Sequence, residues 1–145
     1  MYGPVPNGNE RYYGELLALR AELGLEDTVR FMGPTSDVAG AYATGQVVLV
    51  TSISEGCAFA VVEAMMNARA VVATGVGGIP EALGDTGLIV EARSPDQVAL
   101  ACLGLLRDLD RCARLGEAAR ARALDNFTMA RFLFSYRQIY ARALG

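Results

Sequence analysis

Two glutamates eight positions apart, Glu55 and Glu63, are the residues whose type and spacing best suit chemistry in this sequence. They lie in a stretch where an apolar run ends near Thr51, a small polar loop follows, and a helix is expected to begin near Ala58. In open α/β sheets, ligands bind at such strand-to-helix junctions, because the exposed amides and the positive end of the helix dipole attract phosphate or sugar oxygens. Gly56 lets the backbone come close to such a ligand.

The spacing of the two glutamates distinguishes between two roles for the pair. Eight helical residues rise about 12 Å, so the carboxylates are expected roughly 8 to 12 Å apart even if only the second half is helical. Glycosidase carboxylates lie about 5 to 5.5 Å apart in retaining enzymes and up to about 9.5 Å apart in inverting ones. We therefore favour two acids that accept hydrogen bonds from hydroxyls at opposite ends of an extended ligand. The spacing leaves open that Glu55 caps the helix and Glu63 is an ordinary solvated residue.

Two other loops are weaker candidates for a binding site. Thr74–Glu81 contains three glycines after an apolar run, but it lacks the GxGxxG spacing of a dinucleotide site and by itself favours an ordinary loop. Gly33 and Pro34 follow a further apolar run, where the backbone could lie along a flat base. The second signal is the weaker one.

Composition excludes several kinds of site. The 145 residues include no His, and all 13 basic residues are Arg. The chain therefore has no Ser-His-Asp or Cys-His pair, no two-His zinc site, no Lys Schiff base and no P-loop lysine. We expect any chemistry to come from carboxylates, hydroxyls, backbone amides or Arg.

Charge and cysteine usage indicate the surroundings of the protein. A net charge of −3, with arginines scattered among acids, argues against nucleic-acid binding, which needs a concentrated basic patch. Cys57, Cys102 and Cys112 form no CxxC pair, which favours buried thiols in a reducing compartment, with a reactive thiol at Cys57 as the alternative. The N-terminus lacks a signal-peptide pattern, and no apolar run approaches the roughly 20 residues that span a bilayer. We expect a cytoplasmic protein.

The elements that must position these residues are short apolar strands alternating with helices. Such runs are typical of strands buried on both faces of a parallel sheet. The pattern predicts an α/β chain with a Rossmann-like open parallel sheet and a helical C-terminal third. The expected strands are Val29–Met32, Val47–Thr51, Ala70–Ala73 and Leu88–Val90, and the expected helices are Glu10–Leu23, Val38–Ala43, Ala60–Met66, Pro95–Asp108, Asp110–Ala123 and one that Thr128 caps.

The helix expected from Pro95 should begin with a capping box, in which Ser94 and Gln97 each bond to the other's backbone. At the other end of the chain, residues 2–4 resemble the end of a strand with almost nothing before it. We therefore expect residues 1–145 to form one domain that is incomplete at its N-terminus. The sheet edge left unpaired there could pair with a second copy of the chain.

The motifs, in order, resemble the C-terminal donor domain of the retaining GT-B glycosyltransferases of family 4. The likeness covers nearly the whole chain, and the E-x7-E motif makes it specific. It rests on Ser54–Gly56, Glu63–Met65, Val71–Thr74 and Gly77–Glu81, with flanking agreement at Leu23–Leu25, Val29–Gly33 and Asp125–Thr128.

The resemblance implies the transfer of a sugar from a nucleotide-sugar to an acceptor with retention, without a bound metal or further cofactor. The first glutamate, here Glu55, would lie by the donor sugar as the catalytic residue, and the second, here Glu63, would bind the ribose hydroxyls. The backbone of the remaining donor-binding residues would hold sugar and phosphate oxygens at Gly56, Cys57, Ala58 and Phe59, and would border the base at Gly33 and Pro34.

Departures from the family limit what the chain is expected to do alone. Cys57-Ala58 stands where the family has an aromatic and then Gly or Pro, and Ala68 stands where it has Gly. The family's Arg and Lys that neutralise the diphosphate lie in an earlier strand and loop, and its acceptor domain lies earlier still. We expect this chain to be a donor-binding half that does not transfer sugar by itself. A membrane-peripheral location would apply only to a full-length enzyme. The alternative is a non-catalytic nucleotide-sugar-binding or interaction subunit that needs a separate N-terminal half.

Overall fold

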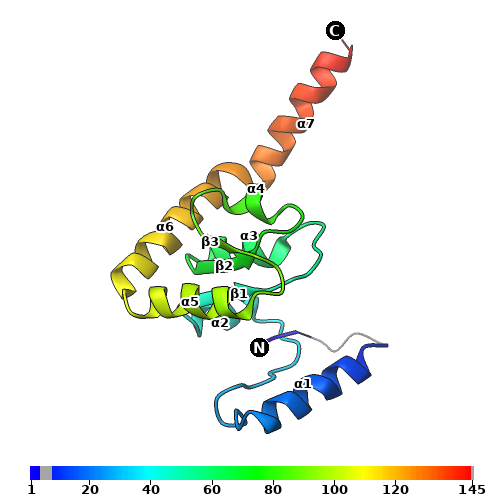
Figure 1. Ribbon diagram of the computed structural model, residues 1–145. Coiled ribbons are helices and arrows are strands. Elements are labelled where there is room, and N and C mark those ends of the chain that lie inside the picture. Colours follow the sequence, from blue (N-terminus) through cyan, green and yellow to red (C-terminus); the bar gives the residue numbers. More distant parts are fainter. Residues whose placement is uncertain (4–7, 145) are drawn as a thin grey trace. The chain divides into compact units, whose positions relative to one another are not determined.

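The computed structural model describes residues 1–3 and 8–144 of the chain (Figure 1). They divide into two compact units, Met1–Ala41 and Tyr42–Gly145. The short helix α2 (Val38–Ala43) crosses the boundary between the units. No helix in the described part of the chain is both long and apolar enough to cross a membrane.

The first unit consists of α1 (Glu10–Glu22) and an extended segment, and it corrects one expectation. The strand expected at Val29–Met32 is not formed. The segment instead bonds irregularly to residues 1–3: the Met32 amide donates to the Met1 carbonyl at 2.8 Å, and the Gly3 amide donates to Gly33 at 2.9 Å. In a regular parallel ladder Gly3 would donate to Met32. The register slips because Gly33 has a φ of +71°, a left-handed conformation outside the strand region.

The second unit contains the predicted parallel sheet. Its strands β1 (Val47–Val50), β2 (Ala70–Thr74) and β3 (Leu88–Val90) lie in that order, with Val48 opposite Val71 and Val72 opposite Leu88. All five residues of β2 are buried, as a central strand covered on both faces requires. The Rossmann-like α/β fold expected from the sequence is confirmed.

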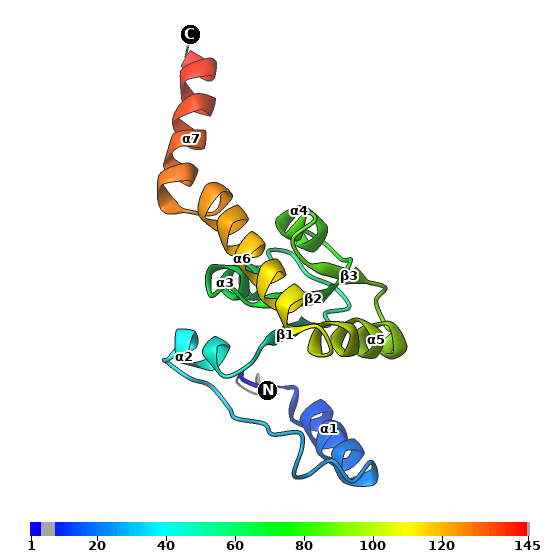
Figure 2. The ribbon, with the colours of Figure 1, turned by 90° about the vertical axis from the view of Figure 1, so that its left-hand side faces the viewer.

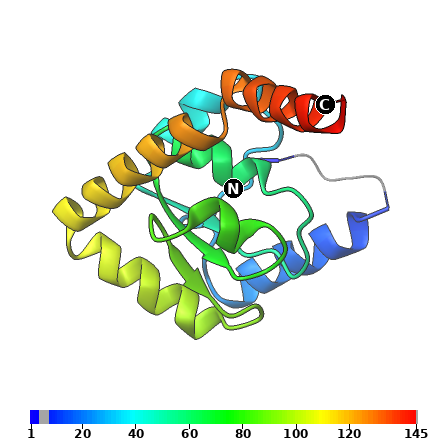
Figure 3. The same ribbon diagram turned by 90° about the horizontal axis from the view of Figure 1, so that it is seen from above.

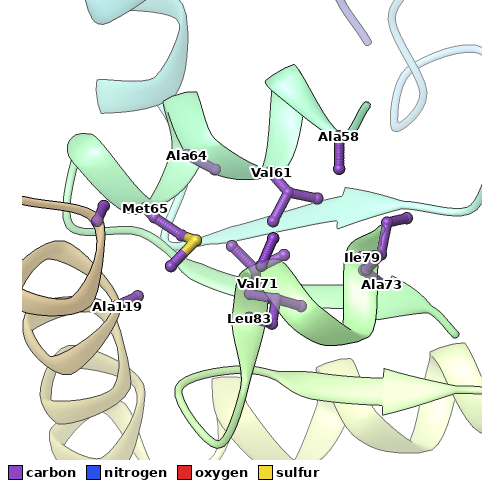
Figure 4. Packing of buried hydrophobic residues seen from close by; sticks show 11 residues of the cluster. Ala58, Val61, Ala64, Met65, Val71, Ala73, Ile79, Leu83 and Ala119 are labelled. Carbon is purple, nitrogen blue, oxygen red and sulfur yellow. The ribbon is translucent and has the colours of Figure 1, made fainter. Parts of the chain in front are cut away.

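Alternation along β2 assigns the helices to the two faces of the sheet. Val71 and Ala73 pack in one cluster with α3 (Phe59–Met66) and α4 (Ile79–Leu83), whereas Val72 packs in another cluster with α5 (Pro95–Leu106). Figures 2 and 3 show the strands between these two sets of helices. Figure 4 shows Val61 and Met65 of α3 pointing toward Val71. Burying an aliphatic side chain of this kind contributes about 1.5–3 kcal/mol, so this cluster fixes α3 on the sheet.

The helical C-terminal third is confirmed by α5, α6 (Leu109–Asn126) and α7 (Met129–Leu144). Thr128 caps α7 as expected, because its hydroxyl accepts a hydrogen bond from the Arg131 amide at 3.3 Å. The prediction of a capping box at Ser94 is wrong, because the box is not formed. Ser94 makes no side-chain cap, and the Gln97 side chain accepts at 3.0 Å from the Glu91 amide at the end of β3 instead.

The three cysteines differ in exposure, so the expectation that all are buried is wrong for one of them. Cys112 is buried and Cys102 half-buried, and burial raises the pKa of both thiols. Cys57 is exposed, because it lies in the loop between β1 and α3.

Candidate functional site

The loop between β1 and α3 is held in place by the neighbouring strand. Thr74, the last residue of β2, is buried, and its hydroxyl donates to the Ser52 carbonyl at 2.6 Å. The adjacent parallel strand therefore sets the direction in which the chain leaves β1. This hydrogen bond of Thr74 was not predicted from the sequence. The signal available for it was a Thr at the end of an otherwise apolar strand.

The glycine loop after β2 packs directly on the Glu55 loop. A Cβ added at Gly77 would overlap the Glu55 carbonyl, and Gly77 has a φ of +55°. A Cβ at Gly78 would lie 3.4 Å from the Gly56 carbonyl oxygen. Two motifs 22 residues apart in sequence thus lie in contact at the carboxyl edge of the sheet. The prediction of an ordinary loop at Thr74–Glu81 missed this contact.

Helix α6 holds the end of α4, the short helix that follows the glycine loop. The Arg122 guanidinium donates to the Ala82 and Glu81 carbonyls, each at 2.8 Å, at the C-terminal end of α4. Helix α4 has only five residues, so these two bonds satisfy a large share of its end carbonyls. Sequence reasoning missed Arg122, which lies 40 positions from its partner.

Glu55 does not cap α3, which excludes the capping alternative. The residue at the N-cap is Ala58, and no side chain bonds to the first turn. Glu55 is half-buried, and its carboxylate accepts a hydrogen bond at 3.3 Å from the Ser52 hydroxyl, which orients it within the loop. The carboxylate lies between a fixed loop and solvent.

The backbone amides that follow Glu55 differ in their hydrogen bonding. Within the described ranges, the N–H groups of Gly56, Cys57 and Ala58 have no hydrogen-bond acceptor. The Phe59 amide differs, because it donates to the Cys57 carbonyl at 2.8 Å. Donors without an acceptor just before the first turn of a helix favour an anion.

Glu63 is exposed on α3 and has one partner that the sequence did not reveal. The Tyr42 hydroxyl, on α2, donates to Glu63 Oε2 at 3.1 Å and also lies 3.1 Å from the Ala60 carbonyl oxygen. Burial, followed by the negative charge of Glu63 and the hydrogen bond to it, raises the pKa of Tyr42 to about 12. Glu63 is thus exposed, as the alternative interpretation expects, and is in addition held by a hydrogen bond from a second helix.

Gly33 and Pro34 belong to the first unit. They line a cavity of about 340 Å³ together with Tyr2, Tyr13 and Phe31. The rings of Tyr13 and Phe31 meet edge to face, with centroids 5.4 Å apart. The cavity walls are mainly apolar, which suits a flat ring better than a charged group.

The described residues contain no group of three or more Cys, Asp and Glu side chains that could hold a metal ion. The groups that the structure describes at the site are the carboxylates of Glu55 and Glu63, the hydroxyls of Ser52 and Tyr42, and backbone amides. Such groups can accept hydrogen bonds from sugar hydroxyls and donate them to phosphate oxygens.

Comparison with known proteins identifies the family that this sequence matches. Residues 3–108 match the sequence model described as "Glycosyl transferases group 1". N-acetyl-alpha-D-glucosaminyl L-malate synthase of Bacillus anthracis is 33% identical over 127 residues, which cover 86% of this chain and 33% of that protein. D-inositol 3-phosphate glycosyltransferase of Corynebacterium aurimucosum is 37% identical over 131 residues, which cover 88% of this chain and 31% of that protein.

Solved structures give the same result for the fold. Sucrose-phosphate synthase of Thermosynechococcus elongatus matches with a TM-score of 0.85 and 27% identity, over 96% of this chain and 35% of that one. HepE of Anabaena, in complex with UDP and glucose, matches with a TM-score of 0.87 and 27% identity, over 99% of this chain and 39% of that one. The chain thus spans about a third of the length of the curated relatives it matches.

Proposed function

Because this chain belongs to the group 1 glycosyl transferases, we propose that it forms the donor-binding part of an enzyme that transfers a sugar, with retention, from a nucleotide-sugar to an acceptor. The nucleotide-sugar is the substrate, and the proposed reaction needs no further cofactor or metal. Binding of the acceptor is assigned to residues beyond this chain, which covers about a third of its relatives.

The observation that carries this proposal is the set of unpaired amides beside Glu55. The N–H groups of Gly56, Cys57 and Ala58 face no acceptor within the described residues, and a diphosphate or sugar oxygen would supply one. This arrangement suits a chain without Lys, because neutral amides and the helix dipole supply part of the positive potential that a diphosphate needs. The complexes of HepE with UDP and with UDP-glucose support the same ligand class.

Each site residue has a role in the proposal. Glu55 lies by the donor sugar, where its carboxylate accepts hydrogen bonds from hydroxyls and stabilises positive charge that develops at the reacting carbon. Glu63 accepts hydrogen bonds from the ribose diol. Gly33 and Pro34 border the base, in keeping with their apolar cavity. Because the Phe59 amide is already paired, we assign the oxygen-binding role to the three amides that precede it.

Calorimetric titration of the purified chain with UDP-, GDP- and ADP-sugars tests the proposal. We expect one nucleotide class to bind, Glu63→Ala to weaken it at least about 10-fold, and Glu55→Ala to weaken the nucleotide-sugar more than the bare nucleotide. Glu117→Ala, which removes an exposed carboxylate on α6, is the matched control and should leave binding unchanged. If no nucleotide binds, the donor-binding role is wrong.

A further inference from the structure

The geometry points to Tyr42 as a positioning residue that holds the Glu63 carboxylate in place for the ribose diol. This inference rests on the proposed function, since it deepens the role given there to Glu63. It assigns Tyr42 no contact with the ligand. Tyr42 acts through Glu63, and its hydroxyl rather than its ring is the part that matters.

Contacts between two helices support this role. Tyr42 comes from α2, and its oxygen lies 3.1 Å from both Glu63 Oε2 and the Ala60 carbonyl oxygen of α3. The Tyr42 ring packs against the buried cluster that includes Val61 and Ala64 of the same helix, so the ring is fixed where the hydroxyl meets the carboxylate. An exposed Glu otherwise samples several rotamers around three side-chain torsions.

The single phenolic proton has two acceptors within reach, and its direction can be assigned. A carboxylate is a stronger acceptor than a backbone carbonyl, so the proton points to Glu63. Because the pKa of Tyr42 is raised to about 12, the phenol remains a donor throughout the physiological range. Among the described residues Glu63 Oε1 has no partner, so one carboxylate oxygen is held and the other is left for a ligand hydroxyl.

Tyr42→Phe isolates the hydroxyl, because it keeps the ring and its packing. Titration with UDP should show a dissociation constant about 3- to 10-fold weaker than that of the original chain. With 2′,3′-dideoxy-UDP, which lacks the diol, the two proteins should bind equally. Combining Tyr42→Phe with Glu63→Ala should weaken UDP no further than Glu63→Ala alone. Tyr140→Phe, at an exposed tyrosine of α7, is the control and should bind both ligands as the original chain does.

A ligand-free measurement tests the contact itself. The chain has no Lys, so between about pH 9 and pH 12 only tyrosines and cysteines titrate. The tyrosinate absorbance of Tyr42, obtained as the difference between the original chain and Tyr42→Phe, should titrate at lower pH after Glu63→Gln. An unchanged titration would show that the contact is absent and would overturn the inference.

Two outcomes separate this inference from the function on which it rests. If UDP binds and Tyr42→Phe weakens UDP and its dideoxy analogue equally, Tyr42 has only a structural role and the inference is wrong while the function stands. If the original chain binds no nucleotide, the proposed function fails, and the ribose role of Tyr42 fails with it.

Discussion

Ala68 ends helix α3 in a backbone conformation that favours glycine, and replacing it should stabilise the protein. Its φ is +53°, and the Ala68 and Arg69 amides donate to the Met65 and Ala64 carbonyls at 2.9 and 3.0 Å. These two bonds define a Schellman motif, in which the left-handed position is usually Gly. The Ala68 carbonyl packs closely against Gly116 of α6, and a Cβ added at Gly116 would overlap this carbonyl. The turn at Ala68 therefore cannot relax.

The expected effect of Ala68→Gly follows from two opposing contributions. A left-handed conformation costs an L-residue about 1–2 kcal/mol, and glycine avoids this cost because it has no Cβ. The greater freedom of glycine in the unfolded chain offsets about 0.4–1 kcal/mol of this gain. We therefore expect the free energy of unfolding to rise by about 0.5–1 kcal/mol, measured from the urea midpoint at unchanged slope.

A matched glycine substitution separates strain from a general effect of glycine. Ala121 is exposed in the middle of α6, where Ala121→Gly should lower the free energy of unfolding by about 1 kcal/mol. The two substitutions should therefore shift the urea midpoint in opposite directions. A loss of stability for Ala68→Gly equal to that for Ala121→Gly would refute the assignment of strain.

Three further predictions concern the site and its supports. Gly77→Ala should displace the Glu55 carbonyl and weaken nucleotide binding at least about 10-fold by calorimetry, whereas Gly104→Ala, with open space around the added Cβ, should not. Arg122→Ala should lower the free energy of unfolding by about 1–3 kcal/mol in urea, because two carbonyls at the end of α4 lose their donors; an unchanged midpoint would show that water replaces them. Because the folded pKa of Tyr42 is raised from 10.0 to about 12, its contribution to stability is present below about pH 10 and is lost as the pH rises toward 12. Urea midpoints measured across this window should fall more steeply for the original chain than for Tyr42→Phe, and parallel curves would contradict the assigned shift.

The sheet and its helices could be predicted because each has a local signal. Apolar runs at Val47, Ala70 and Leu88 marked the three strands, since a central parallel strand must be apolar on both faces. The same reasoning failed at Val29–Met32, whose composition suits a strand but whose ladder breaks at a left-handed glycine. Composition predicts burial and not register, so it could not foresee that break.

The candidate site was predicted in part for a related reason. Glu55 and its loop could be located because a strand-to-helix junction is visible in the sequence. Tyr42 and Arg122 were missed because their roles depend on partners 21 and 40 positions away, and nothing in their neighbours indicates the pairing. The contact of Gly77 with Glu55 likewise exists only once β1 and β2 are adjacent.

Helix α3 links the two glutamate positions to the stability of the whole unit. Its N-terminal end follows the amides that lack an acceptor among the described residues, its middle carries Glu63, and its C-terminal end is the Ala68 turn packed against α6. Because a short helix moves as one body, a shift at the Ala68 turn would displace the amides and the carboxylate together. The close approach of Gly116 and the buried contacts of Met65 therefore help to fix the positions of these amides and of Glu63, although both residues are buried. In this chain the geometry of the proposed site depends on packing at the opposite end of the helix as much as on the site residues.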